Sequence, residues 1–146
     1  MTWDWPGSRW CDVRDWIPAG VGPCVLLNER TGRVIASRVD LAITRGTRRT
    51  GLLGRQGLDA TEALVLAPCI AIHTAFMRFP IDVVFVDRRG RALRVVGSLK
   101  PWRAAMAPLA SAVIELRAEA AGGAVEPGDA LCLLRAPAPR EPDGAR

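Results

Sequence analysis

The segment 68–87 (PCIAIHTAFMRFPIDVVFVD) gathers the side chains of this sequence that are best suited to chemistry. It contains the only histidine of the chain, His73, with Cys69 four positions before it and Asp82 further along. A thiol attacks as its thiolate, and an adjacent imidazole favours that form. Cys69 and His73 could therefore act as nucleophile and base, with Asp82 orienting the imidazole. This pattern makes a cysteine-dependent hydrolase or transferase one hypothesis.

The same three side chains, Cys69, His73 and Asp82, are also ligand types that zinc accepts, and three of them would leave an open position. A structural zinc site usually has four ligands, and further ligand types are missing nearby. The four cysteines of the chain are scattered without a CxxC pair. Neither GxGxxG nor a P-loop pattern is present. We therefore expect no metal and no cofactor.

A structural interpretation of the segment is the third alternative. Cys69 would fill space, His73 would donate to a backbone carbonyl, and Asp82 would cap a turn or pair with Arg78 or Arg103, because a buried acid needs a partner. This interpretation explains Asp82 well. It does not explain why so many polar and cationic groups gather around one segment.

A binding cleft is the interpretation that we prefer. Loop 68–79, the arginines near 45–55 and the turn 100–103 would meet at one end of the sheet, since binding groups tend to sit on loops held by a rigid scaffold. Arginine side chains suit carboxylates and phosphates, and an indole offers a flat apolar wall. The expected partner is a small anionic ligand or an acidic peptide. The predicted ligand-binding residues are Arg55, His73, Thr74, Arg78, Lys100, Trp102 and Arg103.

The overall charge limits other classes of partner. The formal net charge is +5, and only one of the 20 basic residues, Lys100, is a lysine. Nucleic acid is an unlikely partner because the basic residues are mixed with acids and no recognised reader motif is present. No apolar run reaches the ~20 residues of a transmembrane helix. The N-terminus lacks the pattern of a secretory signal, so we expect a cytoplasmic protein with reduced cysteines.

The elements that must position these groups are short strands. With 146 residues and 49% hydrophobic composition, the chain favours one domain with a real core. Turn signals separate the apolar runs, and no long amphipathic helix is present, which predicts a mainly β fold, a compact sandwich or barrel-like domain with one or two short helices. The predicted strands are 24–27, 33–43 with a bulge between 36 and 39, 63–67, 81–86, 92–96, 112–116 and 130–134.

The segments between these strands complete the prediction. A short helix is expected at 48–53, capped by Thr47 and ended by Gly54. Residues 97–106 are expected to be irregular. Residues 1–23 form a Trp-rich N-terminal arm, 24–135 the mainly β domain, and 136–146 a flexible tail.

Several motifs in this order resemble one family. They are GLLGRQGL at 51–58, the segment 68–87, LKPWR at 99–103, IEL at 114–116 and PGD at 127–129. Over roughly residues 25 to 135 the chain resembles the prokaryotic domain of unknown function 192 family. The resemblance implies a compact, mainly β fold and no particular reaction. Some members lie near genes for pilus assembly or secretion, which implies an accessory role.

Overall fold

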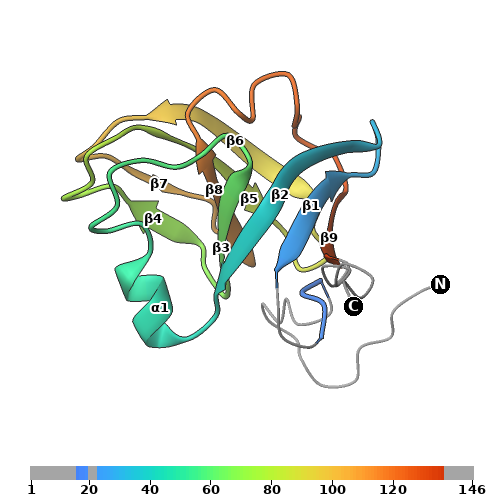
Figure 1. Ribbon diagram of the computed structural model, residues 1–146, viewed down its shortest axis with the longest axis horizontal. Coiled ribbons are helices and arrows are strands. Elements are labelled where there is room, and N and C mark those ends of the chain that lie inside the picture. The colour runs from blue at the N-terminus through green and yellow to red at the C-terminus, as the bar shows by residue number, and fades with distance from the viewer. Residues whose placement is uncertain (1–15, 20–22, 137–146) are drawn as a thin grey trace, which may run out of the picture.

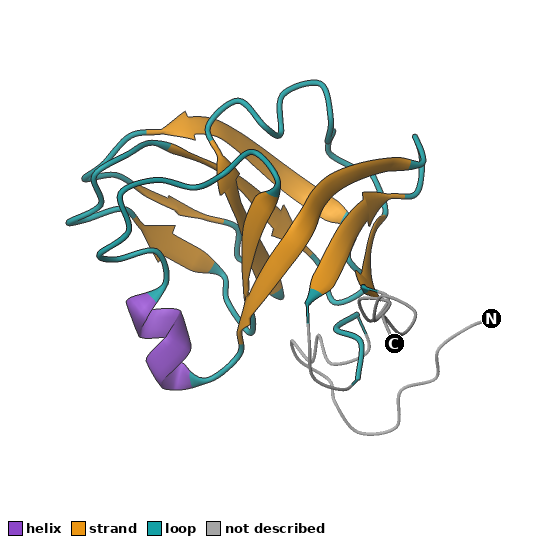
Figure 2. Ribbon diagram, in the orientation of Figure 1, coloured by secondary structure: helices purple, strands orange, loops and turns teal. Residues whose placement is uncertain are grey.

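The computed structural model describes residues 16–19 and 23–136, and these ranges contain nine strands and one short helix (Figure 1 and Figure 2). The strands are β1 (Cys24–Asn28), β2 (Arg33–Ala42), β3 (Glu62–Leu66), β4 (Ala71–His73), β5 (Ile81–Val86), β6 (Ala92–Leu99), β7 (Ala104–Met106), β8 (Ala112–Arg117) and β9 (Leu131–Arg135). The helix, α1, spans Arg45–Thr50. None of the helical structure in the described ranges is long and apolar enough to cross a membrane.

Seven of the strands form one curled sheet with the order β6-β5-β8-β3-β2-β1-β9 (Figure 1). Neighbours are antiparallel except for the parallel pair β2 and β3. The two ends of the sheet approach each other, because Arg91 and Ala130 form an antiparallel bridge and the Leu131 amide donates to the Gly90 carbonyl at 2.9 Å. β4 and β7 form a separate two-stranded sheet. The prediction of a mainly β, barrel-like fold is confirmed.

Both faces of strand β5 are buried, as its sequence, apolar at every position except Asp82, predicts. Val84 and Val86 pack in one core cluster, which fills the curl of the sheet, while Ile81, Val83 and Phe85 pack in a second. The second cluster also contains Ile72 of β4, Ala105 of β7 and Leu52 after α1. Successive residues of a strand point to opposite faces. Only alternate residues of β5 and β8 therefore face the region of α1 and β4.

The first hairpin contains the predicted bulge. Leu26 pairs with Ala36 and Cys24 pairs with Val39, so β2 advances by three residues where β1 advances by two. The slip in apolar alternation between residues 36 and 39 therefore predicted the bulge correctly.

The prediction for the helix was wrong by about one turn. Thr44, rather than Thr47, is the N-cap, and its hydroxyl accepts a hydrogen bond from the Thr47 amide at 3.1 Å. The Thr47 hydroxyl accepts in return from the Thr44 amide at 3.0 Å, which completes a capping box. Gly51, with φ of 47°, ends the helix in place of Gly54. Threonine is a suitable N-cap residue at either position, and the structure uses Thr44, the earlier of the two in sequence.

Two further expectations were wrong in the same part of the chain. The segment 68–79, expected to be a loop, contains β4, and the segment 97–106, expected to be irregular, contains the end of β6 and all of β7. Both strands of the second sheet are three residues long. Such short strands carry too little alternation to be recognised from sequence.

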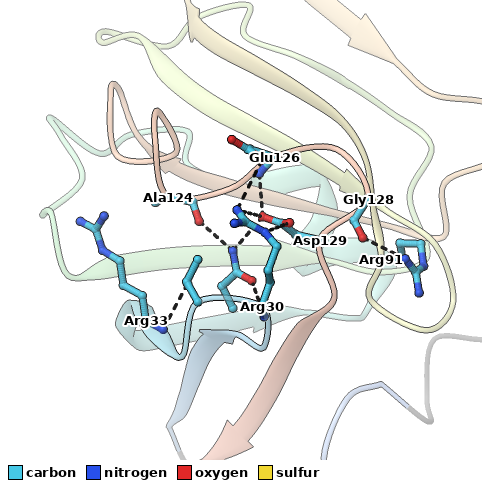
Figure 3. Close-up of polar contacts among 9 residues, drawn as sticks. Arg30, Arg33, Arg91, Ala124, Glu126, Gly128 and Asp129 are labelled. Carbon is cyan, nitrogen blue, oxygen red and sulfur yellow. Dashed lines mark hydrogen bonds and ion pairs between the residues drawn. The ribbon is translucent and has the colours of Figure 1, made fainter.

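The loop 124–129 is held to the β1–β2 turn by a polar network (Figure 3). The Asp129 carboxylate accepts from Arg30 Nε at 2.5 Å, from Asn28 Nδ2 at 2.8 Å and from the Glu126 amide at 2.8 Å. The hydrogen bond from Arg30, more than the others, holds the pKa of Asp129 well below its usual range. The PGD motif at 127–129 therefore has a structural role.

The Trp-rich arm is described only at residues 16–19 and 23. The Trp16 ring is buried, its Nε1 donates to the Leu131 carbonyl at 2.7 Å, and it packs against Gly90 so closely that no Cβ would fit there. Trp3, Trp5 and Trp10 lie outside the described residues, as does the tail from residue 137.

Candidate functional site

A cleft of about 340 Å³ lies between α1 and β4, which are neighbours in Figure 1. We call it the α1–β4 cleft. Its apolar lining includes Leu52, Leu66, Ile72 and Met77. Its polar lining consists of Arg45, Arg48, Arg49 and Thr50 from α1, Cys69 and His73 from the β4 region, and Glu115 from β8. The structure therefore brings together side chains from three segments that are distant in sequence.

Arg45, Arg48 and Arg49 form what we call the arginine rim. Arg48 is half-buried, and its Nη1 donates to the carbonyls of Ile43 at 2.9 Å and Ala67 at 3.2 Å. Arg45 and Arg49 are exposed, and neither guanidinium has a hydrogen bond or ion pair with any of the described residues. One guanidinium is thus fixed by the fold, and two remain open to a ligand.

Glu115 is the functional candidate that the sequence analysis missed. Its side chain lies in the interior, only 4% of the residue is exposed, and its Oε2 has no hydrogen-bond partner among the described residues. Burial raises the pKa of this carboxyl from 4.5 to about 7, and the charge of Arg55 opposes the rise. The available signal was an acid inside the apolar run AVIEL, because a fully buried acid is rare. The run was predicted as a strand and forms part of a family motif, but its acid was not considered as a site residue.

Cys69 lines the cleft, and its surroundings favour the protonated thiol. Its Sγ donates to the Ala71 carbonyl at 3.1 Å. Burial is the main cause that raises the pKa of the thiol. His73 is exposed at the end of β4, and within the described ranges no hydrogen bond joins it to Cys69. These features favour the neutral thiol over the thiolate that a nucleophile needs.

Asp82 does not join Cys69 and His73, so the predicted arrangement of these three residues is wrong. Asp82 is 1% exposed, and its two carboxylate oxygens accept from the amides of Ser98 and Ala121, each at 2.8 Å. It shares the face of Val84, on the side of β5 away from the α1–β4 cleft. Its partners are backbone amides and not Arg78 or Arg103. Among the described residues, no group of His, Cys, Asp and Glu is arranged to hold a metal.

Thr74 has a positioning role in the structure. It is fully buried, its hydroxyl donates to the Lys100 carbonyl at 2.6 Å, and it accepts from the Arg103 amide at 2.9 Å. The Thr74 amide donates to the Arg103 carbonyl at 2.8 Å. The hydroxyl is therefore used within the protein, which corrects the prediction that it contacts a ligand.

The turn 100–103 lies outside the α1–β4 cleft, so the single cleft predicted from the sequence is two separate surfaces. Trp102 is 60% exposed and packs against exposed Phe76, with ring centroids 4.6 Å apart. Arg78, Lys100 and Arg103 are exposed and are not part of the cleft lining.

Arg55, also predicted to bind ligand, pairs with two acids. Its Nη2 lies 3.3 Å from Asp40 Oδ2, and its Nη1 lies 3.6 Å from Glu62 Oε2. It is close enough to Glu115 to influence the pKa of that carboxyl. Arg55 therefore acts on the cleft through its charge.

Fold and site together define a small curled β domain with a cationic cleft beside its second sheet. The family model of DUF192, described as "Uncharacterized ACR, COG1430", matches residues 26–133. The chain belongs to this family, as its motifs indicated.

Two solved structures share the fold. A protein of unknown function from Novosphingobium aromaticivorans is 24% identical, with a TM-score of 0.62, covering 75% of this chain and 82% of that one. A protein from Sinorhizobium meliloti described as a "putative transcription regulator" is 20% identical, with a TM-score of 0.67, covering 79% of this chain and 98% of that one. A search of curated proteins gave no match.

Proposed function

We propose that this protein is a non-catalytic binding domain and that its α1–β4 cleft holds a small anionic ligand. The observation that carries the proposal is the arginine rim, in which Arg45 and Arg49 are exposed and unpaired among the described residues while Arg48 is fixed beside them. Guanidinium groups bind carboxylates and phosphates through paired, charge-assisted hydrogen bonds.

The dimensions of the cleft support a small ligand over an acidic peptide. A volume of about 340 Å³ falls at the lower end of the range for small-molecule sites. Leu52, Ile72 and Met77 supply apolar walls, and the polar groups are few and placed at the rim and the floor. The accessory role in pilus assembly or secretion rests on the family resemblance alone.

Removing the two open guanidinium groups is expected to weaken anion binding strongly. In the double variant Arg45→Ala/Arg49→Ala, each lost charged hydrogen bond should cost about 1.5–3 kcal/mol. Isothermal titration with inorganic phosphate, succinate and malate measures the effect. The matched control is Arg88→Ala/Arg89→Ala, which removes the same charge from exposed residues of the β5–β6 turn.

The control separates a local site from the general charge of the protein. We expect the control to change affinity by less than about threefold, since exposed charges more than a Debye length away are largely screened at 0.15 M salt. Equal weakening by both double variants would contradict the proposed site. The same conclusion would follow if the wild type bound none of the anions.

The rival function, a hydrolase or transferase using Cys69, is tested by Cys69→Ser. We expect this variant to retain ligand affinity within about threefold, because a hydroxyl nearly preserves the shape of the thiol. In the native wild type we expect iodoacetamide to react with Cys69 slowly at pH 7, because a half-buried thiol with a raised pKa contains little thiolate. A hyper-reactive Cys69, together with an activity that Cys69→Ser abolishes, would establish the enzyme instead.

A further inference from the structure

We propose that the ligand of the α1–β4 cleft carries a hydrogen-bond-donating group, a hydroxyl or an amine, in addition to its anionic group, and that Glu115 receives this donor at the floor of the cleft. Glu115 would then be the residue that determines specificity. This inference rests on the proposed function and narrows its ligand to small hydroxy- or amino-bearing carboxylates or phosphates.

The unpaired oxygen of Glu115 is the first observation. Buried polar atoms in native proteins nearly always have a hydrogen-bond partner, and each exception needs an explanation. Asp82 and Asp129, the other buried acids of this fold, are both satisfied by groups of the protein. Glu115 Oε2 has no such partner among the described residues, although only 4% of the residue is exposed. Glu115 also lines the cleft, so its side chain borders the space that a ligand would occupy.

The charges around Glu115 fix the orientation of such a ligand. The arginine rim lies on α1 and Arg55 lies nearby, whereas the Cys69 thiol already donates to Ala71 and His73 is exposed at the end of β4. The anionic group is therefore attracted to the rim, and the donor is attracted to the carboxylate. A ligand with anionic groups alone would bring negative charge toward Glu115 and leave Oε2 unpaired.

Succinate, malate and aspartate test this inference because they share a four-carbon dicarboxylate and differ by a hydrogen, a hydroxyl or an ammonium group. Titrations at pH 8 keep Glu115 largely ionised, as its pKa is about 7. We expect malate, aspartate or both to bind the wild type at least tenfold more tightly than succinate. For phosphate-bearing ligands, the corresponding comparison is between the affinities of ethyl phosphate and 2-aminoethyl phosphate.

Variants of Glu115 link the preference to this carboxyl. In Glu115→Met, which removes both acceptors, the preference for the donor-bearing ligand should fall to about one, with succinate affinity unchanged or improved. Glu115→Gln keeps one acceptor without charge and should give an intermediate preference. Glu119→Gln, an exposed acid outside the cleft, is the matched control and should keep the wild-type preference.

The outcomes separate this inference from the function on which it rests. If all probes bind the wild type equally, or if the preference survives in Glu115→Met, the inference is wrong, while weakening by Arg45→Ala/Arg49→Ala would still support the cleft. If no probe binds the wild type, both proposals fall.

Discussion

Replacing Asp82 with alanine is expected to lower the free energy of unfolding by about 3–5 kcal/mol. The substitution removes both acceptors and leaves the Ser98 amide and the buried Ala121 amide without partners. Those amides belong to the end of β6 and to the turn after β8. Losing the two hydrogen bonds therefore weakens the attachment of β5 to both neighbouring strands. Urea unfolding followed by circular dichroism measures the change. A loss of this size would show that Asp82 stabilises the fold.

Asp59→Ala is the control for Asp82→Ala, because Asp59 is exposed and, among the described residues, its carboxylate accepts only from the Thr61 amide, at 3.4 Å. Its cost should stay within about 0.5 kcal/mol. An Asp82→Ala protein as stable as the control, but unable to bind ligand, would return Asp82 to the functional site.

Glu115 should make the wild-type protein lose stability as the pH rises through 7. The folded-state pKa of this acid is raised from 4.5 to about 7, so between these values the folded state binds more protons than the unfolded state. Stability therefore falls with rising pH in this window, and the favourable contribution is fully present only below about pH 4.5. Since each pKa unit corresponds to about 1.4 kcal/mol, the total effect is about 3 kcal/mol.

The variant Glu115→Gln should remove this loss. It is expected to be more stable than the wild type by up to about 3 kcal/mol at pH 8 and by much less at pH 5, because an amide cannot ionise. Unfolding free energies at pH 5, 6, 7 and 8 for both proteins test it, and His73→Gln controls for the exposed imidazole. Parallel curves for wild type and Glu115→Gln would show that the carboxyl is not desolvated.

The sheet could be predicted because its information is local and periodic. The sequence of β5, apolar at every position except Asp82, indicated a strand buried on both faces, and the slip after Ala36 indicated the bulge in the pairing with β1. Turn residues such as Asp87 and Gly90 fixed the hairpin that follows, with the Gly90 amide donating to the Asp87 carbonyl at 3.0 Å. Each of these features depends on neighbours in sequence.

The site depends on which face of each strand a side chain occupies in the folded sheet, and it was predicted only in part. Cys69, His73 and the arginines near residue 45 do meet in one cleft, as expected. Asp82 and Glu115, however, lie on opposite faces of adjacent strands, and of these two acids only Glu115 lines the cleft. The strand register that decides between them, with Asp82 beside Leu116 and Val83 beside Glu115, is set by the whole sheet.

The most direct test of the α1–β4 cleft is a titration of the ¹⁵N-labelled protein with malate, followed by NMR through the backbone amides and the arginine Nε–Hε signals. If the cleft binds malate, the largest chemical-shift changes should fall on residues 45–53, 69–77 and 115. The side-chain signals of Arg45 and Arg49 should move with the same titration midpoint as these amides. Shifts confined to the turn around Trp102, or spread evenly over the basic residues, would contradict it.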